Sequence, residues 1–173
     1  MKPTSELAAL DPAELYERDF YAWTRQQARA LARLRGRPGN LGLDAVHLAE
    51  EIRDLGSEQR HAIESQIERL VEHLLKLEHS ELAGPRRVWA RSVGSARREI
   101  DRRLTPTLER AVVRRLTKLY EHARRDARLA LLDRPEPEAA AALPETCPYT
   151  LERLLTDGWY PANRHGLPSP EAA

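Results

Sequence analysis

The sequence has little of what marks disulfide-rich, membrane-spanning or disordered proteins. Its 173 residues include a single cysteine, Cys147, so no intramolecular disulfide can form and a reducing compartment is expected. No stretch approaches the roughly 18 apolar residues of a membrane helix, and the N-terminus lacks a basic-then-apolar signal pattern. With 41% apolar and 32% charged residues, the chain has a globular rather than a disordered composition. We therefore expect a cytoplasmic protein without membrane attachment.

Motifs that carry catalytic chemistry are also scarce. The chain shows no serine, histidine and aspartate triad order, no glycine-rich phosphate loop and no pair of cysteines with metal-binding spacing. Cys147 lies in the stretch ETCPYT without a neighbouring histidine that could activate it. The sequence thus leans against an enzyme, assigns no catalytic residue, and gives no reason to expect a cofactor.

Apolar residues recur with the helical period along most of the chain, and no segment alternates as a strand would. The pattern predicts an all-α fold, a small single-domain helical bundle over residues 11–161 with one long central helix. Residues 1–10 and 162–173 are expected to be flexible termini. The predicted helices span about residues 12–35, with a restart at Asp19 as an option, and 44–79, 86–104, 107–132 and 150–157. Gly36 and the segment RPGNLGL separate the first two.

The long central helix has an apolar stripe whose members step by three or four residues. The stripe consists of Leu48, Ile52, Leu55, Gln59, Ile63, Ile67, Leu70, Leu74 and Leu77. Its phase continues through Gly56, which costs roughly 1 kcal/mol relative to alanine in a helix. One continuous helix, with a kink at Gly56 as an option, is therefore predicted, and a break with Ser57 as a new cap is the alternative.

Carboxylates and histidines form a second stripe on the same helix. Together with His47, the weak metal or acid–base candidates are Glu51, Asp54, Glu58 and His61. This stripe lies about 120° from the apolar one, whereas metal ligands in helical bundles point inward from facing helices. A solvated or salt-bridged face is the favoured interpretation, and no metal site is assigned.

Polar side chains interrupt the apolar stripe every seven residues. Gln59, Gln66 and His73 are expected to find partners on the third helix, with Trp89 and Ser92 as candidates. A satisfied core network is one interpretation. The other is a polar cavity that binds a small ligand, with His73 changing charge near neutral pH.

Arginine outnumbers lysine by 25 to 3 and is concentrated in residues 86–128, which hold 14 basic and 5 acidic side chains. The candidate anion or nucleic-acid patch within this block is Arg91, Arg97, Arg98, Arg102 and Arg103. Phosphate binding would need these arginines on one face. They alternate among faces instead, so pairing with the acidic long helix is the favoured interpretation.

Six ordered blocks give the chain a family resemblance. They are DFYAW (19–23), HLAEEIRDLGSEQR (47–60), HLLK (73–76), RREI (97–100), CPYTLERLL (147–155) and WYP (159–161). Over about residues 16 to 161 the sequence resembles the bacterial family known as domain of unknown function 29. The resemblance implies an all-helical fold and a bacterial origin, and it brings no established activity and no catalytic residues.

Three functions remain open at this stage. The favoured one is a non-enzymatic helical module whose charged faces bind another protein or a second copy of the chain. The alternative is nucleic-acid binding through the arginine-rich hairpin of residues 86–128. The third is a metal-dependent or small-ligand-binding protein that uses the histidine and carboxylate residues of the long helix.

Overall fold

The computed structural model describes residues 10–34 and 42–170, and every regular element within them is a helix, which confirms the all-α class. In chain order these are α2 (Pro12–Arg18), α3 (Phe20–Arg33), α4 (Ala45–His79), α5 (Arg86–Asp101), α6 (Pro106–Val113), α7 (Leu116–Leu132), α8 (Pro137–Ala141) and α9 (Leu151–Leu155). None of the described helices has a stretch of the length and apolarity that crossing a bilayer requires. Most of the predicted break after Gly36, and the predicted flexible ends 1–9 and 171–173, lie outside the described residues.

Two predicted helices are each divided in two. Asp19 leaves the helical conformation and caps α3, its carboxylate accepting a 2.9 Å hydrogen bond from the Ala22 N–H. The helix expected over residues 107–132 is interrupted after two β-branched residues, Val112 and Val113, whose restricted χ1 lowers helix propensity. The chain turns there, with the Arg115 N–H donating to the Val112 carbonyl at 2.8 Å.

The chain forms two compact units, of which the first comprises residues 1–62 and 104–111. Its described part contains α2, α3, the first half of α4 and most of α6. The fully buried Asp19 carboxylate also binds the start of α6. It accepts hydrogen bonds from the Thr105 hydroxyl at 3.0 Å and the Thr107 N–H at 3.2 Å. One carboxylate therefore caps α3 and fixes α6 within this unit.

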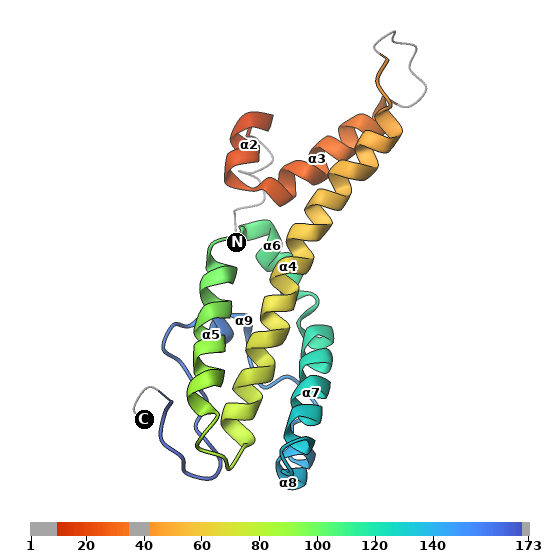
Figure 1. Cartoon of the computed structure of the whole chain (residues 1–173). Helices are drawn as coiled ribbons and strands as arrows, with labels where there is room; N and C mark the ends of the chain where they lie inside the picture. The colour runs from red at the N-terminus through yellow and green to blue at the C-terminus, as the bar shows by residue number, and fades with distance from the viewer. Residues whose placement is uncertain (1–9, 35–41, 171–173) are drawn as a thin grey trace. The chain divides into compact units, whose positions relative to one another are not determined.

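The second unit comprises residues 63–103 and 112–173. Figure 1 shows α5 and α7 on two sides of the C-terminal half of α4. The apolar faces of these helices are buried, which includes Ile63, Ile67, Leu70, Leu74, Trp89, Val93, Ile100, Leu119, Tyr120, Ala123 and Ala127. This apolar core is what the 3.6-residue period predicts for a helical bundle. The single-domain organisation of residues 11–161 stays a prediction.

The long helix α4 is continuous through Gly56, so the predicted alternative of a break with a cap at Ser57 is wrong. The predicted stripe is nevertheless wrong at two positions, because Leu48 and Leu55 are exposed. Their neighbours Ala49 and Gly56 are the buried ones. Small residues let α3 approach closely, and this turns the two leucines about 100° to the side.

The C-terminal part differs from the expectation of a loose chain. Residues 162–170 are attached to the end of α4, where the Asn163 amide donates to the carbonyls of Leu77 and Ser80 at 2.9 Å each. The carbonyls at a helix C-terminus have no partner within the helix, and Asn163 supplies donors for them. The proline- and alanine-rich connector between α7 and α9 contains the short helix α8.

Candidate functional site

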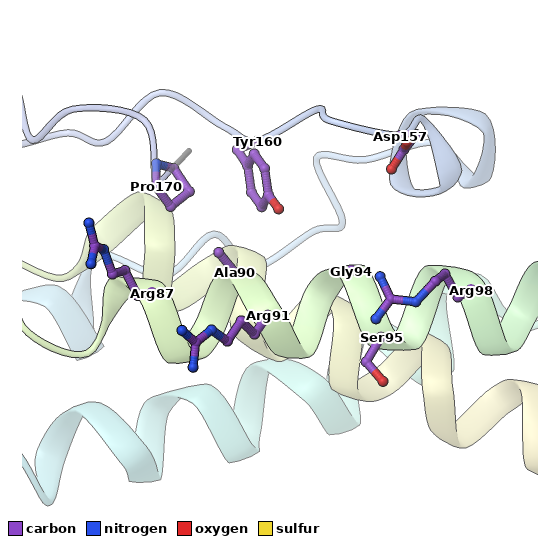
Figure 2. A pocket seen from close by; sticks show the side chains of 9 residues that line it. All are labelled: Arg87, Ala90, Arg91, Gly94, Ser95, Arg98, Asp157, Tyr160 and Pro170. Atoms are coloured by element: carbon purple, nitrogen blue, oxygen red, sulfur yellow. The ribbon is translucent and has the colours of Figure 1, made fainter. Parts of the chain in front are cut away.

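A groove of about 710 Å³ lies in the second unit between α5 and residues 157–170, the C-terminal segment. Figure 2 shows arginines of α5 along one wall, with Tyr160 and Pro170 of the C-terminal segment opposite. The lining residues are Arg87, Ala90, Arg91, Gly94, Ser95, Arg98, Asp157, Tyr160 and Pro170. The groove therefore combines guanidinium groups with one aromatic ring and one carboxylate.

The helical period of α5 explains why these arginines share a face. Arg87, Arg91 and Arg98 are separated by four and seven residues, which places them on one side of a helix. The opposite side, with Trp89 and Val93, is buried in the core. Burial of this apolar face therefore directs the three arginines outward.

Gly94 keeps the floor of the groove open between the arginines. A Cβ on this residue would have only an Arg98 guanidinium nitrogen as a neighbour, at 3.4 Å. The side chain of Arg98 is long and exposed, so the space above Gly94 is available to a ligand.

Two buried arginines of α5 hold the C-terminal segment in place. Arg97 donates from Nε to the Leu154 carbonyl at 2.9 Å and from Nη2 to the Trp159 carbonyl at 2.7 Å. Its guanidinium also lies 5.5 Å from the centre of the Tyr160 ring. These contacts fix the groove wall that carries Tyr160.

Arg86 performs the same task at the other end of the segment. Its Nη1 donates to the Leu77 carbonyl at 2.8 Å and its Nη2 to the Pro168 carbonyl at 3.1 Å. The arginines of α5 thus fall into two classes. Arg86 and Arg97 are buried and bind backbone carbonyls, whereas Arg91 and Arg98 are exposed along the groove.

The five residues of the predicted anion patch do not share one surface in the structure. Arg97 is buried because backbone carbonyls of the C-terminal segment satisfy its donors. Arg102 and Arg103 both form ion pairs with Glu99, the second at 2.7 Å. Of the five predicted residues, only Arg91 and Arg98 line the groove.

The arginines of the basic block do not pair with α4 as a group. Arg115 forms an ion pair with Glu64 of α4 at 2.7 Å. Arg124, in contrast, donates to the Leu143 carbonyl at 3.2 Å, and Arg110 donates to the Thr107 hydroxyl at 3.0 Å. Local partners therefore hold several of these side chains.

The polar positions on α4 are divided between the two units. Gln59 belongs to the first unit, whereas Gln66 and His73 belong to the second. Within the described residues, the Oε1 atom of Gln59 and the Nδ1 atom of His73 are buried without a hydrogen-bond partner. Burial, followed by the nearby charge of Lys76, lowers the pKa of His73 to about 4. Its charge therefore does not change near neutral pH.

Trp89 packs against two cations. The ammonium of Lys76 lies 5.5 Å and the guanidinium of Arg134 5.4 Å from its ring centre. Lys76 is itself buried and donates to Glu72 at 2.6 Å. Ser92 is half-buried on the same helix as Trp89. The arrangement is a packed ion pair over an aromatic ring.

The carboxylate stripe is a solvent-facing surface of the first unit. Its four weak metal candidates, Glu51, Asp54, Glu58 and His61, are all exposed. His47 bonds to Asp44, and the His61 ring lies 3.0 Å from an Arg60 nitrogen. The described residues contain no group of three or more metal-ligating side chains suited to an ion.

Several groove residues were not among the candidates chosen from the sequence. The spacing of Arg87 from Arg91 could have identified Arg87. Asp157, Tyr160 and Pro170 had no such signal, because they lie outside regular helices and reach α5 only through tertiary contacts.

Comparisons with known proteins agree with the fold and supply no activity. A family model described as a domain of unknown function, DUF29, matches residues 15–160. A crystal structure of an alpha-helical protein of unknown function from Rhodospirillum rubrum is similar, with 27% identity and a TM-score of 0.66. The match covers 83% of this chain and 90% of that one. No curated protein matches the chain.

Proposed function

The chain belongs to the DUF29 family, and from its groove we propose that it is a non-enzymatic helical module that binds an acidic segment of a partner protein. The observation that carries the proposal is the row of Arg87, Arg91 and Arg98 opposite Tyr160. The single cysteine, Cys147, is consistent with a reducing compartment, and a cytoplasmic location is part of the proposal.

The chemistry of the lining favours a protein ligand. Arginine and tyrosine are enriched at protein interfaces and among the residues that contribute most to binding. A guanidinium presents two parallel N–H donors that match the two oxygens of a carboxylate. Ser95 adds a hydroxyl. An extended segment with Asp or Glu at intervals would present carboxylates to the arginines and apolar atoms to Tyr160.

The Asp157 carboxylate favours a peptide ligand over a nucleic acid. This carboxylate lines the same groove as the arginines, so a continuous row of phosphates would bring like charges together. A peptide carries backbone N–H donors that a carboxylate accepts. The arginines that would extend the basic surface, Arg102 and Arg103, are paired with Glu99. Both features favour an acidic protein segment over nucleic acid.

Fluorescence anisotropy with labelled probes tests the proposal. The probes are a 12-residue peptide with alternating acidic and apolar residues, its Asn/Gln counterpart, and single- and double-stranded 12-nucleotide DNA. We expect the acidic peptide to bind at least tenfold more tightly than the neutral peptide and either DNA. Equal binding of the two peptides, or tighter binding of DNA, would overturn the proposal.

A charge-matched pair of variants then locates the site. R91E/R98E reverses two groove arginines, and R114E/K118E reverses two exposed cations outside the groove. We expect at least a tenfold loss of peptide affinity for the first and less than a threefold change for the second. Equal losses would mean that affinity follows net charge and not the groove.

Gly94→Leu provides a test that leaves the charge unchanged. A leucine side chain would occupy the groove floor, and replacing glycine within a helix contributes about 0.8–1 kcal/mol to stability. We expect this variant to melt at the wild-type temperature or above and to lose peptide binding. Retained affinity would place the binding surface elsewhere.

A further inference from the structure

Two exposed leucines form an apolar strip on the first half of α4. The exposed fractions are 38% for Leu48 and 49% for Leu55, and the half-buried Ile52 lies between them. A separation of seven residues places both leucines on one side of the helix. Glu51 and Glu58 are exposed and lie about 60–80° from this line, so the strip has an acidic edge.

A strip of the opposite charge lies on α7 in the second unit. Leu129 and Leu132 have exposed fractions of 53% and 41%. Arg125 and Arg128 are exposed beside them, and Arg125 also forms a 3.4 Å ion pair with its exposed neighbour Asp126. These four residues lie at positions i, i+3, i+4 and i+7, within an arc of about 100°. They face away from the buried side of α7, so this strip combines leucines with a basic edge.

We infer that a second copy of this chain binds these strips, with α4 of one copy packed against α7 of the other. Such a contact would bury leucine against leucine and bring Glu51 and Glu58 near Arg125 and Arg128. Pairing α4 with α4 would oppose carboxylates, and pairing α7 with α7 would oppose arginines. Charge therefore selects the mixed contact.

Each strip lies within one compact unit, so the inference does not depend on how the units of one chain are arranged. The strips share no residue with the groove. Self-association and binding of an acidic peptide can therefore fail independently. Two mixed contacts related by a twofold axis give a closed dimer, whereas a single repeated contact gives a growing chain of copies.

Sedimentation velocity over about 1–100 µM measures the association, with E51R/E58R and R125E/R128E as test variants. Each variant alone opposes like charges at the contact, and we expect the dissociation constant to rise at least tenfold. In an equimolar mixture of the two variants, each α4–α7 contact between a copy of one variant and a copy of the other again joins opposite charges. We expect the mixture to associate as the wild type does.

The mixture is the decisive sample because a folding defect in either variant could not be repaired by mixing. Helical circular dichroism of each variant provides the folding control. L48S/L55S should also dissociate the wild-type assembly, whereas V88S, which changes an exposed apolar residue outside both strips, should not. A monomeric wild type across the range, or a mixture that stays monomeric, would overturn the inference.

Discussion

Gly56 of α4 lies directly against Thr24 of α3. A Cβ on Gly56 would stand 2.3 Å from the Thr24 hydroxyl oxygen and 3.2 Å from its Cβ. Thr24 is fully buried, and its hydroxyl donates to the Tyr21 carbonyl at 2.9 Å. Glycine is therefore required here by the close approach of two helices, although the helix itself continues without interruption.

Gly56→Ala is accordingly expected to destabilise the protein. In a free helix alanine would stabilise by about 1 kcal/mol, but here its methyl group overlaps a buried side chain. Overpacking of this kind costs about 1–3 kcal/mol. Urea unfolding followed by circular dichroism measures the change. Gly94→Ala is the control, because its methyl group meets only the flexible Arg98 side chain, and it should be neutral or stabilising. Equal effects of the two substitutions would contradict the close contact.

Arg97→Met should destabilise the second unit far more than Arg98→Met. The first substitution leaves the carbonyls of Leu154 and Trp159 without their guanidinium donor. A buried polar group without a partner costs about 1–3 kcal/mol. Arg98 is exposed, so its replacement should change the free energy of unfolding by less than about 0.5 kcal/mol. Thermal unfolding of both variants measures the difference, and similar melting temperatures would show that Arg97 does not hold the segment.

The lowered pKa of His73 implies that the stability of the protein depends on pH. Burial lowers its pKa from 6.5 to about 4 in the folded protein, so between these values the unfolded chain binds more protons. Stability from this group is complete above pH 6.5 and is lost as the pH falls towards 4, by at most about 1.4 kcal/mol per pH unit. His73→Gln should reduce the slope in this window. Urea unfolding at several pH values measures it, and an unchanged slope would exclude His73 as the cause.

Asp19→Ala should be more damaging than Asp11→Ala, although both residues cap helices. Asp11 is exposed and caps α2, and loss of such a cap costs about 0.5–2 kcal/mol. Asp19 is fully buried and also accepts hydrogen bonds from Thr105 and Thr107. Its removal leaves additional donors unpaired. Urea titrations that compare the two variants test this order, and a larger effect of Asp11→Ala would reverse it.

The helical period was sufficient to predict the fold class and the continuity of α4. It failed on the phase of the first half of α4, because hydrophobicity ranks leucine above alanine and glycine. The close packing of α3 instead buries Ala49 and Gly56 and exposes Leu48 and Leu55. Which residue faces a neighbouring helix depends on the distance between the helices, and the sequence of one helix does not contain that distance.

The groove could not be predicted from the sequence, for a related reason. Three of its nine lining residues lie within residues 157–170, which follow no helical or strand period. The partners of Arg97 are 57 and 62 positions away. Arg91 and Arg97 therefore look equivalent in the sequence, although one lines a groove and the other is buried as a support.

The most direct test of the proposed function is a chemical-shift map of the ¹⁵N-labelled protein titrated with the acidic 12-residue peptide. We expect the largest changes at the backbone amides of Ala90, Gly94 and Ser95 and at the side-chain Nε–H groups of Arg91 and Arg98. Changes spread over the exposed cations of α7, or no changes at saturating peptide, would contradict the proposed function.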